Sequence, residues 1–250
     1  MWACTFIFSI FFLPLAASIL SLDLGADQWV VDLADHDDIY AVSHLAKDPQ
    51  LSFVSSQAQS LRTHKGSPEI LFHPSLKMVI GYAPISPLIE KICKDRKIKL
   101  VTLSYPQSLQ ELEQQVHLFS RLFPCSRKPE TWLQDLKLSQ KTPRATAVFW
   151  GRAGLCPGGS TLLNDLLKTT PYENLYEKKK GWTYNSLESL IQPSLVAVFF
   201  LDPAAPHPLW SLLEKKGIRL QILPHKLTLS PYPPALIELI KMINTSGTTS

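Results

Sequence analysis

The sequence predicts an α/β protein made of two similar β-α lobes with parallel sheets, joined by a helical connector, with a cleft between the lobes. Three observations lead to this prediction. Short apolar segments alternate with helical patterns in both halves of the chain, one phrase recurs half a chain later, and a Pro-interrupted amphipathic stretch separates the two copies. We place the N-terminal lobe at 19–106, the helical connector at 107–140 and the C-terminal lobe at 141–250.

The first half of the chain has the pattern of a β-α-β-α lobe. Ser67 is a suitable N-cap for a short helix, because Pro68 fits the first helical position and Glu69 lies at the positive end of the helix dipole. Pro74 ends this helix and an apolar strand follows. The expected elements are a strand at 19–23, a helix at 26–33, a strand at 39–43, the short helix from 67, a strand at 77–82, a helix at 86–96 and a strand at 98–103.

Capping residues, prolines and apolar patterns also predict the elements of the connector and of the second half of the chain. Ser108 and Glu111 have capping-box spacing before an amphipathic helix, and Pro124 stops or kinks that helix. Ser160 is the expected cap of a helix after the glycine-rich loop "GRAGLCPGGS". The expected elements are helices at 108–123 and 129–138, a strand at 145–150, the loop at 151–160, a helix at 161–168, a strand at 195–201, a helix at 207–216, a strand at 218–223 and a helix at 233–243.

The repeated phrase is "SPEILFHPSL" at 67–76, which returns as "SLESLIQPSL" at 186–195. Both copies run directly into an apolar strand. The simplest interpretation is that they mark the same α-to-β unit in two similar lobes. Convergent capping chemistry is the alternative, because Ser-x-Glu before a helix and Pro-Ser before a strand are both locally favoured.

Composition excludes several classes of protein. The 250 residues are 45% hydrophobic and 18% charged with a net charge of +4, which is ordinary for a globular protein. The lysine-rich runs at 94–99 and 177–181 are short, so we expect solvated surface and no nucleic-acid partner. Cys93, Cys125 and Cys156 match no C-x-x-C pattern and permit at most one internal disulfide.

The N-terminus carries a targeting signal. Residues 1–18 contain no charged side chain and end in Ala16-Ala17-Ser18, which fits a small-x-small cleavage site. We therefore predict a signal peptide at 1–18 and a mature chain that starts near Ile19 outside the cytoplasm. The usual Lys or Arg ahead of the apolar region is missing, so an uncleaved membrane anchor is the alternative.

The order of motifs resembles the periplasmic substrate-binding proteins of ABC importers, of the vitamin B12 and ferric-siderophore (helical-backbone) type. The resemblance rests on "SLDLGADQWVVDLADHDDIYAVSHLAKDP", "SPEILFHPSLKMVIGY", "CPGGSTLLNDLLKTTPYENLY" and "NSLESLIQPSLVAVFF", which cover most of the mature chain. It implies a monomeric periplasmic receptor, without a cofactor, that delivers a cobalamin-like or iron-chelate ligand to an ABC importer permease dimer. Ser75 and Ser194 depart from it, because the family usually has Asp there.

The resemblance also implies a role for the repeated glutamate. In the family one exposed Glu on each lobe docks into arginine pockets of the two permease subunits, and the matching positions here are Glu69 and Glu188. Charge-assisted Arg–carboxylate pairs suit docking because they orient as well as attract. The alternative is that each Glu only stabilises the start of its helix.

We expect the ligand to bind in the cleft between the lobes, where strand ends and helix starts converge. Aromatic side chains at strand ends and in loops would offer flat surfaces to a ring-bearing ligand, and one arginine would meet an anionic group. The candidate ligand-binding residues are Tyr82, Tyr105, Trp150, Arg152, Trp182 and Tyr184. Loops 202–206 and 225–232 are among those expected to line the cleft.

Two alternatives to this function remain, and enzyme activity is not expected. One is a zinc- or manganese-type metal-ion receptor using His44, His73, His207 or His225; the other is a membrane-anchored, non-transport protein of the same fold. The glycine-rich loop lacks the Gly-Lys-Ser/Thr of a phosphate loop, and no G-x-S-x-G elbow exists. A nucleophilic Cys156 paired with a distant histidine is the weakest interpretation, so we assign no catalytic residue.

Overall fold

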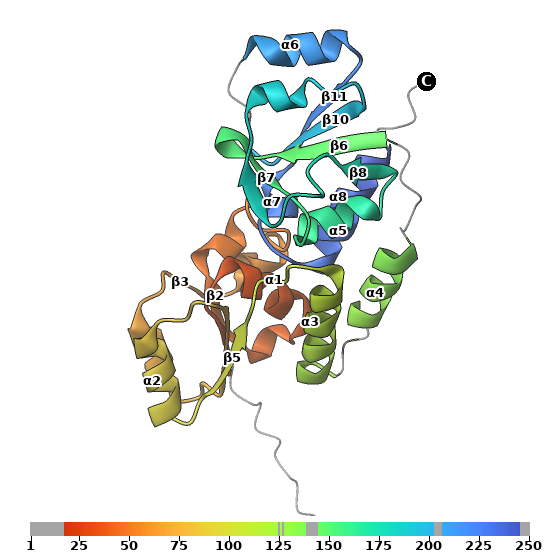
Figure 1. Ribbon diagram of the computed structural model, residues 1–250. Coiled ribbons are helices and arrows are strands. Elements are labelled where there is room, and N and C mark those ends of the chain that lie inside the picture. The colour runs from red at the N-terminus through yellow and green to blue at the C-terminus, as the bar shows by residue number, and fades with distance from the viewer. Residues whose placement is uncertain (1–17, 125, 127, 139–144, 203–206, 246–250) are drawn as a thin grey trace, which may run out of the picture.

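A computed structural model describes residues 18–124, 126, 128–138, 145–202 and 207–245. The predicted signal peptide and its predicted cleavage site, apart from Ser18, therefore lie outside the described residues, as does Cys125. Figure 1 shows the N-terminal lobe, coloured red to yellow, below the C-terminal lobe, coloured green to blue. The predicted two-lobe α/β fold is confirmed.

The N-terminal lobe is built on a five-stranded parallel sheet of strand order β3-β2-β1-β4-β5. Its strands are β1 (Ile19–Ser21), β2 (Ile39–Ser43), β3 (Thr63–His64), β4 (Met78–Tyr82) and β5 (Lys99–Leu103). Helix α1 (Leu24–Leu33) begins at Asp23, whose Oδ1 accepts a hydrogen bond from the Ala26 N–H at 3.0 Å. The buried residues of α1 pack with one face of the sheet, and Cys93 of α2 (Pro87–Asp95) packs with the other.

The C-terminal lobe repeats this topology. Its parallel sheet has the order β11-β10-β6-β8, so β6, β8, β10 and β11 correspond to β1, β2, β4 and β5 of the first lobe. The strands are β6 (Ala145–Trp150), β8 (Tyr172–Asn174), β10 (Leu195–Phe200) and β11 (Arg219–Ile222). The helices are α5 (Leu162–Lys168), α6 (Pro208–Lys215), α7 (His225–Thr228) and α8 (Pro233–Thr245). A separate antiparallel pair joins β7 (Leu155–Pro157) to β9 (Trp182–Tyr184).

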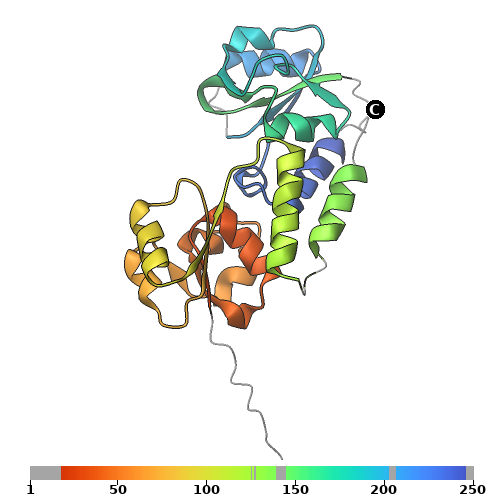
Figure 2. The same cartoon turned by 60° about the horizontal axis from the view of Figure 1, so that its bottom comes forward.

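The two lobes are connected by a pair of helices, α3 (Leu109–Leu122) and α4 (Lys128–Leu138), which pack against each other beside the lobes (Figure 2). The predicted capping box is present, because Ser108 Oγ accepts a hydrogen bond from the Glu111 N–H at 3.1 Å. Glu111 Oε2 accepts in turn from the Gln107 N–H at 2.7 Å, one residue earlier than the usual box. The predicted interruption near Pro124 separates the two helices.

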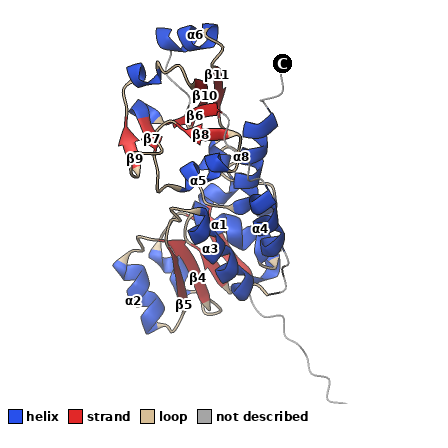
Figure 3. Ribbon diagram, turned by 45° about the vertical axis from the view of Figure 1, so that its right-hand side comes forward, coloured by secondary structure: helices blue, strands red, loops and turns tan. Residues whose placement is uncertain are grey.

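Trp29 of α1 lies at the centre of the largest apolar core. Its ring stacks on Phe119 of α3 with centroids 4.3 Å apart, and meets Trp132 of α4 and Tyr232 edge-on at 5.9 Å and 5.7 Å. In Figure 3 helix α8 lies beside β8 of the upper strands, and α1, α3 and α4 lie below it, next to β4 of the lower strands. One cluster of buried side chains therefore runs from the first sheet through the helix pair into the second sheet.

The C-terminal segment crosses back to the first lobe, a contact that local sequence patterns did not predict. Tyr232 donates its hydroxyl to Asp32 Oδ2 at 2.5 Å, and Gln28 Nε2 donates to Ser230 Oγ. Both contacts join residues about two hundred positions apart in the chain. Helix α8 then packs against α4 and α5. The lobes are thus held together by the connector and by this returning segment.

Some local predictions were wrong. The segment Pro68–Phe72 is a 3₁₀ helix, here called η4, and its N-cap Ser67 makes no side-chain capping bond. Helix α5 is capped by Thr161, whose Oγ1 accepts from the Asn164 N–H at 3.2 Å, and not by Ser160. Ser160 has a φ of +59°, so its backbone turns the chain before the helix begins. The short strands β3, β7, β8 and β9 were not predicted, because each is only two or three residues long.

Asp27 ties α1 to strand β2 inside the first lobe. The carboxyl group is fully buried, with Oδ1 accepting the Ser43 N–H at 2.9 Å and Oδ2 accepting the Ser43 hydroxyl at 2.5 Å. Burial raises the pKa of this carboxyl from 3.8 to about 7, against the opposing effect of the Ser43 hydrogen bonds. The group is therefore partly protonated near neutral pH.

The raised pKa of Asp27 predicts a loss of stability with rising pH. An acid with a higher pKa in the folded chain binds its proton more tightly there, so its contribution to the unfolding free energy falls as pH rises from 3.8 to about 7. In urea unfolding the free energy of unfolding of the unmodified chain should fall with rising pH between 3.8 and about 7. We expect the Asp27→Asn variant to lack about 2–4 kcal/mol of that fall. Exposed Asp95→Asn is the matched control. An unchanged pH profile in Asp27→Asn would rule out this assignment.

Candidate functional site

A cavity of about 290 Å³ lies where the C-terminal lobe faces the end of strand β5. Its walls come from the loops that follow β5 and β6, from the start of α5, from β9 and from the segment between α7 and α8. The lining residues are Tyr105, Pro106, Gln107, Gly151, Arg152, Leu155, Thr161, Leu162, Leu163, Trp182, Leu201, Asp202, Thr228, Leu229, Ser230, Pro231 and Leu236. Such a mainly apolar cavity with a few polar groups is typical of small-molecule sites.

Tyr105 forms the wall on the side of the first lobe and also bridges the two lobes. Its hydroxyl donates to the Leu229 carbonyl at 2.5 Å, and its ring tilts against Tyr82 with centroids 5.6 Å apart. Tyr82 is itself fixed by its hydroxyl, which donates to Gln115 Oε1 at 2.9 Å, and by its N–H, which donates to Asp23 Oδ2 at 2.7 Å. Burial raises the pKa of Tyr105 to about 12, so this phenol stays a neutral donor at physiological pH.

Arg152 brings positive charge to the cavity. Its backbone N–H donates to Asp202 Oδ2 at 3.2 Å, and the other carboxylate oxygen of Asp202 lies 3.8 Å from His225 Nε2. No hydrogen bond or ion pair engages the Arg152 guanidinium within the part of the chain that the structure describes. A carboxylate or an anionic chelate in the cavity could therefore pair with this guanidinium without displacing a protein partner.

Trp182 is carried to the cavity by the β7–β9 pair, and the glycine-rich loop makes this possible. A side chain at Gly154 would lie 2.2 Å from the Asn185 carbonyl oxygen, and one at Gly158 would lie 2.2 Å from that of Lys179. Only glycine allows the two backbones to approach this closely. The loop therefore has a structural explanation: it lets β9 pack against β7 and leaves Trp182 48% exposed beside the cavity.

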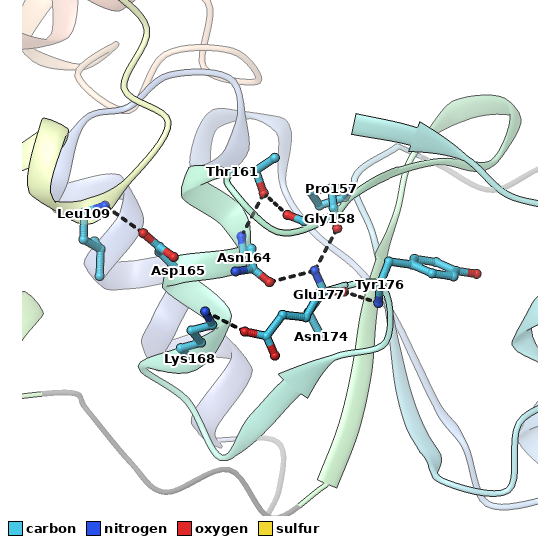
Figure 4. Close-up of polar contacts among 10 residues, drawn as sticks. All are labelled: Leu109, Pro157, Gly158, Thr161, Asn164, Asp165, Lys168, Asn174, Tyr176 and Glu177. Carbon is cyan, nitrogen blue, oxygen red and sulfur yellow. Dashed lines mark hydrogen bonds and ion pairs between the residues drawn. The ribbon is translucent and has the colours of Figure 1, made fainter. Parts of the chain in front are cut away.

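The first turn of α5 is held by a buried polar network, drawn in Figure 4. Asn174 Nδ2 donates to the Pro157 carbonyl at 2.8 Å and to Asn164 Oδ1 at 3.1 Å. Thr161 Oγ1 donates to the Gly158 carbonyl at 2.7 Å. Because Thr161 and the two leucines after it line the cavity, this network fixes the shape of that wall.

Helix α5 also contacts the connector. Asp165 Oδ2 accepts a hydrogen bond from the Leu109 N–H at 3.2 Å, which joins α5 to the first residue of α3 (Figure 4). On the same helix Lys168 pairs with Glu177 at 2.7 Å. The hydrogen bond between Leu109 and Asp165 orients the C-terminal wall of the cavity relative to the helix pair α3–α4.

The structure brings three of the six predicted ligand-binding residues to one cavity, namely Tyr105, Arg152 and Trp182. Tyr82 does not line the cavity, but its ring packs against the ring of Tyr105. Tyr184 is 75% exposed and lies outside the lining.

Trp150 does not line this cavity, because it is buried in the lobe's own core. Successive side chains of β6 point to opposite faces of the sheet. Phe149 joins the large core that spans the lobes, whereas Trp150 packs in the other core with its ring 6.3 Å from that of Trp210. The sequence alone does not show which face of β6 is turned toward the cavity. It could therefore not decide whether Trp150 lines the cavity.

Sequence reasoning missed several lining residues. Gln107 and the leucines of α5 carried no motif that pointed to a site. Loop 225–232 was expected to line the cleft, and its Thr228–Pro231 part does so. Of the predicted loop 202–206, Asp202 lines the cavity and residues 203–206 lie outside the described part.

Three of the four histidines considered as metal ligands make separate local contacts. His73 stacks on Tyr40 at 4.0 Å, His207 caps α6 by accepting the Leu209 N–H at 3.1 Å, and His225 faces Asp202. Within the described ranges, no group of three or more His, Cys, Asp or Glu side chains is placed to hold a metal ion. Cys93 and Cys156 are buried free thiols.

Glu69 and Glu188 occupy equivalent exposed positions. Glu69 lies in η4, which leads into β4, and Glu188 lies in a second 3₁₀ helix, η6 (Leu187–Leu190), which leads into β10. The Ser186 hydroxyl holds the pKa of Glu188 below its usual value, so that carboxylate is charged at neutral pH. Among the residues described, none of the helices is long and apolar enough to cross a membrane.

No protein-family model and no curated protein matches the chain in sequence. Solved structures do match its fold. A possible iron-binding (periplasmic solute-binding) protein from Staphylococcus epidermidis ATCC 12228 is 15% identical with a TM-score of 0.68, over 90% of this chain and 97% of that one. The periplasmic heme-binding protein RhuT from Roseiflexus sp. RS-1 is 15% identical with a TM-score of 0.65, over 93% and 100%.

The periplasmic heme-binding protein HutB of Vibrio cholerae is 13% identical with a TM-score of 0.66, over 90% of this chain and 98% of that chain. All three neighbours are matched over nearly their full length. At these identities the similarity concerns the fold. The chain has the two-lobe, helical-backbone fold of periplasmic solute-binding proteins.

Proposed function

We propose that the chain is an extracytoplasmic solute-binding receptor that delivers an iron-chelate or cobalamin-like ligand to an ABC importer. The observation that carries this proposal is the cavity between the lobes, where Tyr105, Trp182 and Arg152 converge. Flat aromatic faces suit a ring-bearing ligand, and the guanidinium suits an anionic substituent. The neighbours named as heme- or iron-binding support this class of ligand.

Binding without chemistry is consistent with the groups in the cavity. The Tyr105 phenol is held neutral and already donates to Leu229, and the Asp202 carboxylate faces His225. None of these groups is paired with a nucleophile in the manner of a catalytic triad. The receptor would therefore release its ligand unchanged to the permease.

The ligand proposal predicts that hemin, cyanocobalamin or a ferric hydroxamate binds and quenches tryptophan fluorescence. Trp182→Ala and Arg152→Gln should each weaken the bound chelate by about ten- to a hundredfold, through loss of a stacking face and of a charged hydrogen bond respectively. Titration of each variant by fluorescence, with calorimetry as a second readout, measures the change.

Trp150→Phe is the matched control for this experiment, because Trp150 packs outside the cavity lining. It should bind the chelate like the unmodified chain even if it unfolds more easily. Equal affinity in all of these variants, with intact folds, would place the ligand somewhere other than this cavity.

We further propose that Glu69 and Glu188 dock the receptor on the two permease subunits. Both carboxylates are exposed and occupy equivalent positions of two similar lobes, which suits a partner with two related subunits. Arginines on the partner would pair with them in an orienting contact.

The docking proposal predicts graded losses of transport. Single Glu69→Ala and Glu188→Ala changes should lower ligand uptake in the native host, the double change should lower it more, and Lys at either position should be worse than Ala because like charges would then meet. The melting temperature should hardly change, because both side chains are exposed. Exposed Glu130→Ala is the control. Full uptake in the double variant would mean that the glutamates serve only their helix ends.

The localisation proposal is that the chain is exported and cleaved near Ile19, so that the mature chain begins with β1. N-terminal sequencing of the protein recovered from its native host should give a start close to Ile19. Recovery of an intact Met1 in the membrane fraction would favour the membrane-anchored alternative.

A further inference from the structure

Each copy of the repeated phrase exposes a large apolar side chain three residues after its glutamate. Phe72 follows Glu69 in the first lobe and is 60% exposed, and Ile191 follows Glu188 in the second and is 49% exposed. A single exposed apolar residue is ordinary on a protein surface. Two at matching positions of an internal repeat, each beside a carboxylate, need a specific explanation.

The helix type places Glu69 and Phe72 on the same outward face, and Ile191 directly follows η6 as its C-terminal cap. In a 3₁₀ helix the side chains at positions i and i+3 eclipse one another. Both Glu69 and Phe72 lie within η4, and the Ile191 N–H donates to the Glu188 carbonyl at 3.0 Å in the same i to i+3 pattern. The fully buried Leu71 and Leu190 anchor the two 3₁₀ helices to their lobes.

Different contacts hold the two 3₁₀ helices in place. In the first lobe the Arg96 guanidinium lies 5.7 Å from the centroid of the Phe72 ring and donates to the Leu71 carbonyl. In the second lobe the hydroxyls of Tyr176 and Ser189 lie 2.5 Å apart, and Ser189 Oγ also donates to the Ser186 carbonyl at 2.5 Å. Preorganised side chains lose less conformational entropy when a partner binds.

We propose that Glu69 with Phe72, and Glu188 with Ile191, form two equivalent docking patches for the two subunits of the importer. Each subunit would offer a basic side chain to the carboxylate and an apolar socket to Phe72 or Ile191. This inference rests on the proposed docking function and extends it, because burial of the apolar side chains supplies affinity while the carboxylates orient the complex.

Crosslinking identifies what covers the two patches. The photo-reactive residue p-benzoylphenylalanine replaces Phe72, Ile191 or, as a control, Ile222, which is 56% exposed on β11 outside both repeats. In the native host, positions 72 and 191 should both crosslink to a membrane-embedded importer subunit, and position 222 should not. The Glu69→Ala, Glu188→Ala double change should suppress both crosslinks.

Affinity measurements then separate the apolar contribution from the carboxylates. With the crosslinked importer in nanodiscs, Phe72→Ser and Ile191→Ser should each weaken receptor binding by about tenfold, with partial rescue in Phe72→Leu, while Ile222→Ser should not. Hemin binding should stay unchanged in each variant, which excludes a general loss of folding, and only the Phe72 changes should lower the melting temperature slightly, because they alter the contact with Arg96.

Three results would overturn this inference in distinguishable ways. If only the glutamate changes weaken binding, the carboxylates dock alone and the receptor function stands. If neither the glutamate substitutions nor the Phe72 and Ile191 substitutions weaken binding, the docking proposal fails together with this inference. If the crosslinks join two copies of this chain, and sedimentation shows a dimer that Phe72→Ser dissociates, the patches serve self-association.

Discussion

Trp29 stacks on Phe119 with ring centroids 4.3 Å apart, while Trp132 and Tyr232 meet its edges. These four rings come from α1, α3, α4 and the segment before α8, so they join the first lobe, the helix pair and the C-terminal segment. Aromatic contacts of this kind combine a large buried area with preferred geometry. The core around them continues into both sheets, while each lobe also has a smaller apolar core of its own on the other face of its sheet.

The position of the cavity follows from this shared core. Tyr105 enters from the strand side of the first lobe and donates to Leu229, which belongs to the same returning segment as Ser230 and Tyr232. On the other side Asp165 of α5 accepts the Leu109 N–H of α3. The walls that would face a ligand are therefore fixed relative to one another by contacts in the cavity wall itself and by the contact between α5 and α3. A preformed site of this kind suits a receptor that binds and releases a rigid ring system.

Much of the fold could be predicted because its signals are local. Apolar runs, Ser108 as a cap and Pro124 as a break specify strands and helices within a few residues of themselves. The alternating pattern and the repeated phrase indicated two lobes, and Arg152 and Trp182 were found because they lie in or beside loops at strand ends. The rest depends on distant partners. The face of β6 that carries Trp150 is decided by which elements cover the sheet, and the contact between Tyr232 and Asp32 joins opposite ends of the chain. No local sequence pattern indicates the face on which Trp150 lies or the contact between Tyr232 and Asp32.

We infer that the shared core holds the lobes in one arrangement before any ligand arrives. Pulsed electron paramagnetic resonance measures it most directly, with spin labels on noncanonical side chains at the exposed positions Lys91 of α2 and Lys215 of α6. For the ligand-free chain we predict a single narrow distance distribution that hardly shifts when hemin is added. A broad or two-peaked distribution without ligand, collapsing to one peak on binding, would contradict the account.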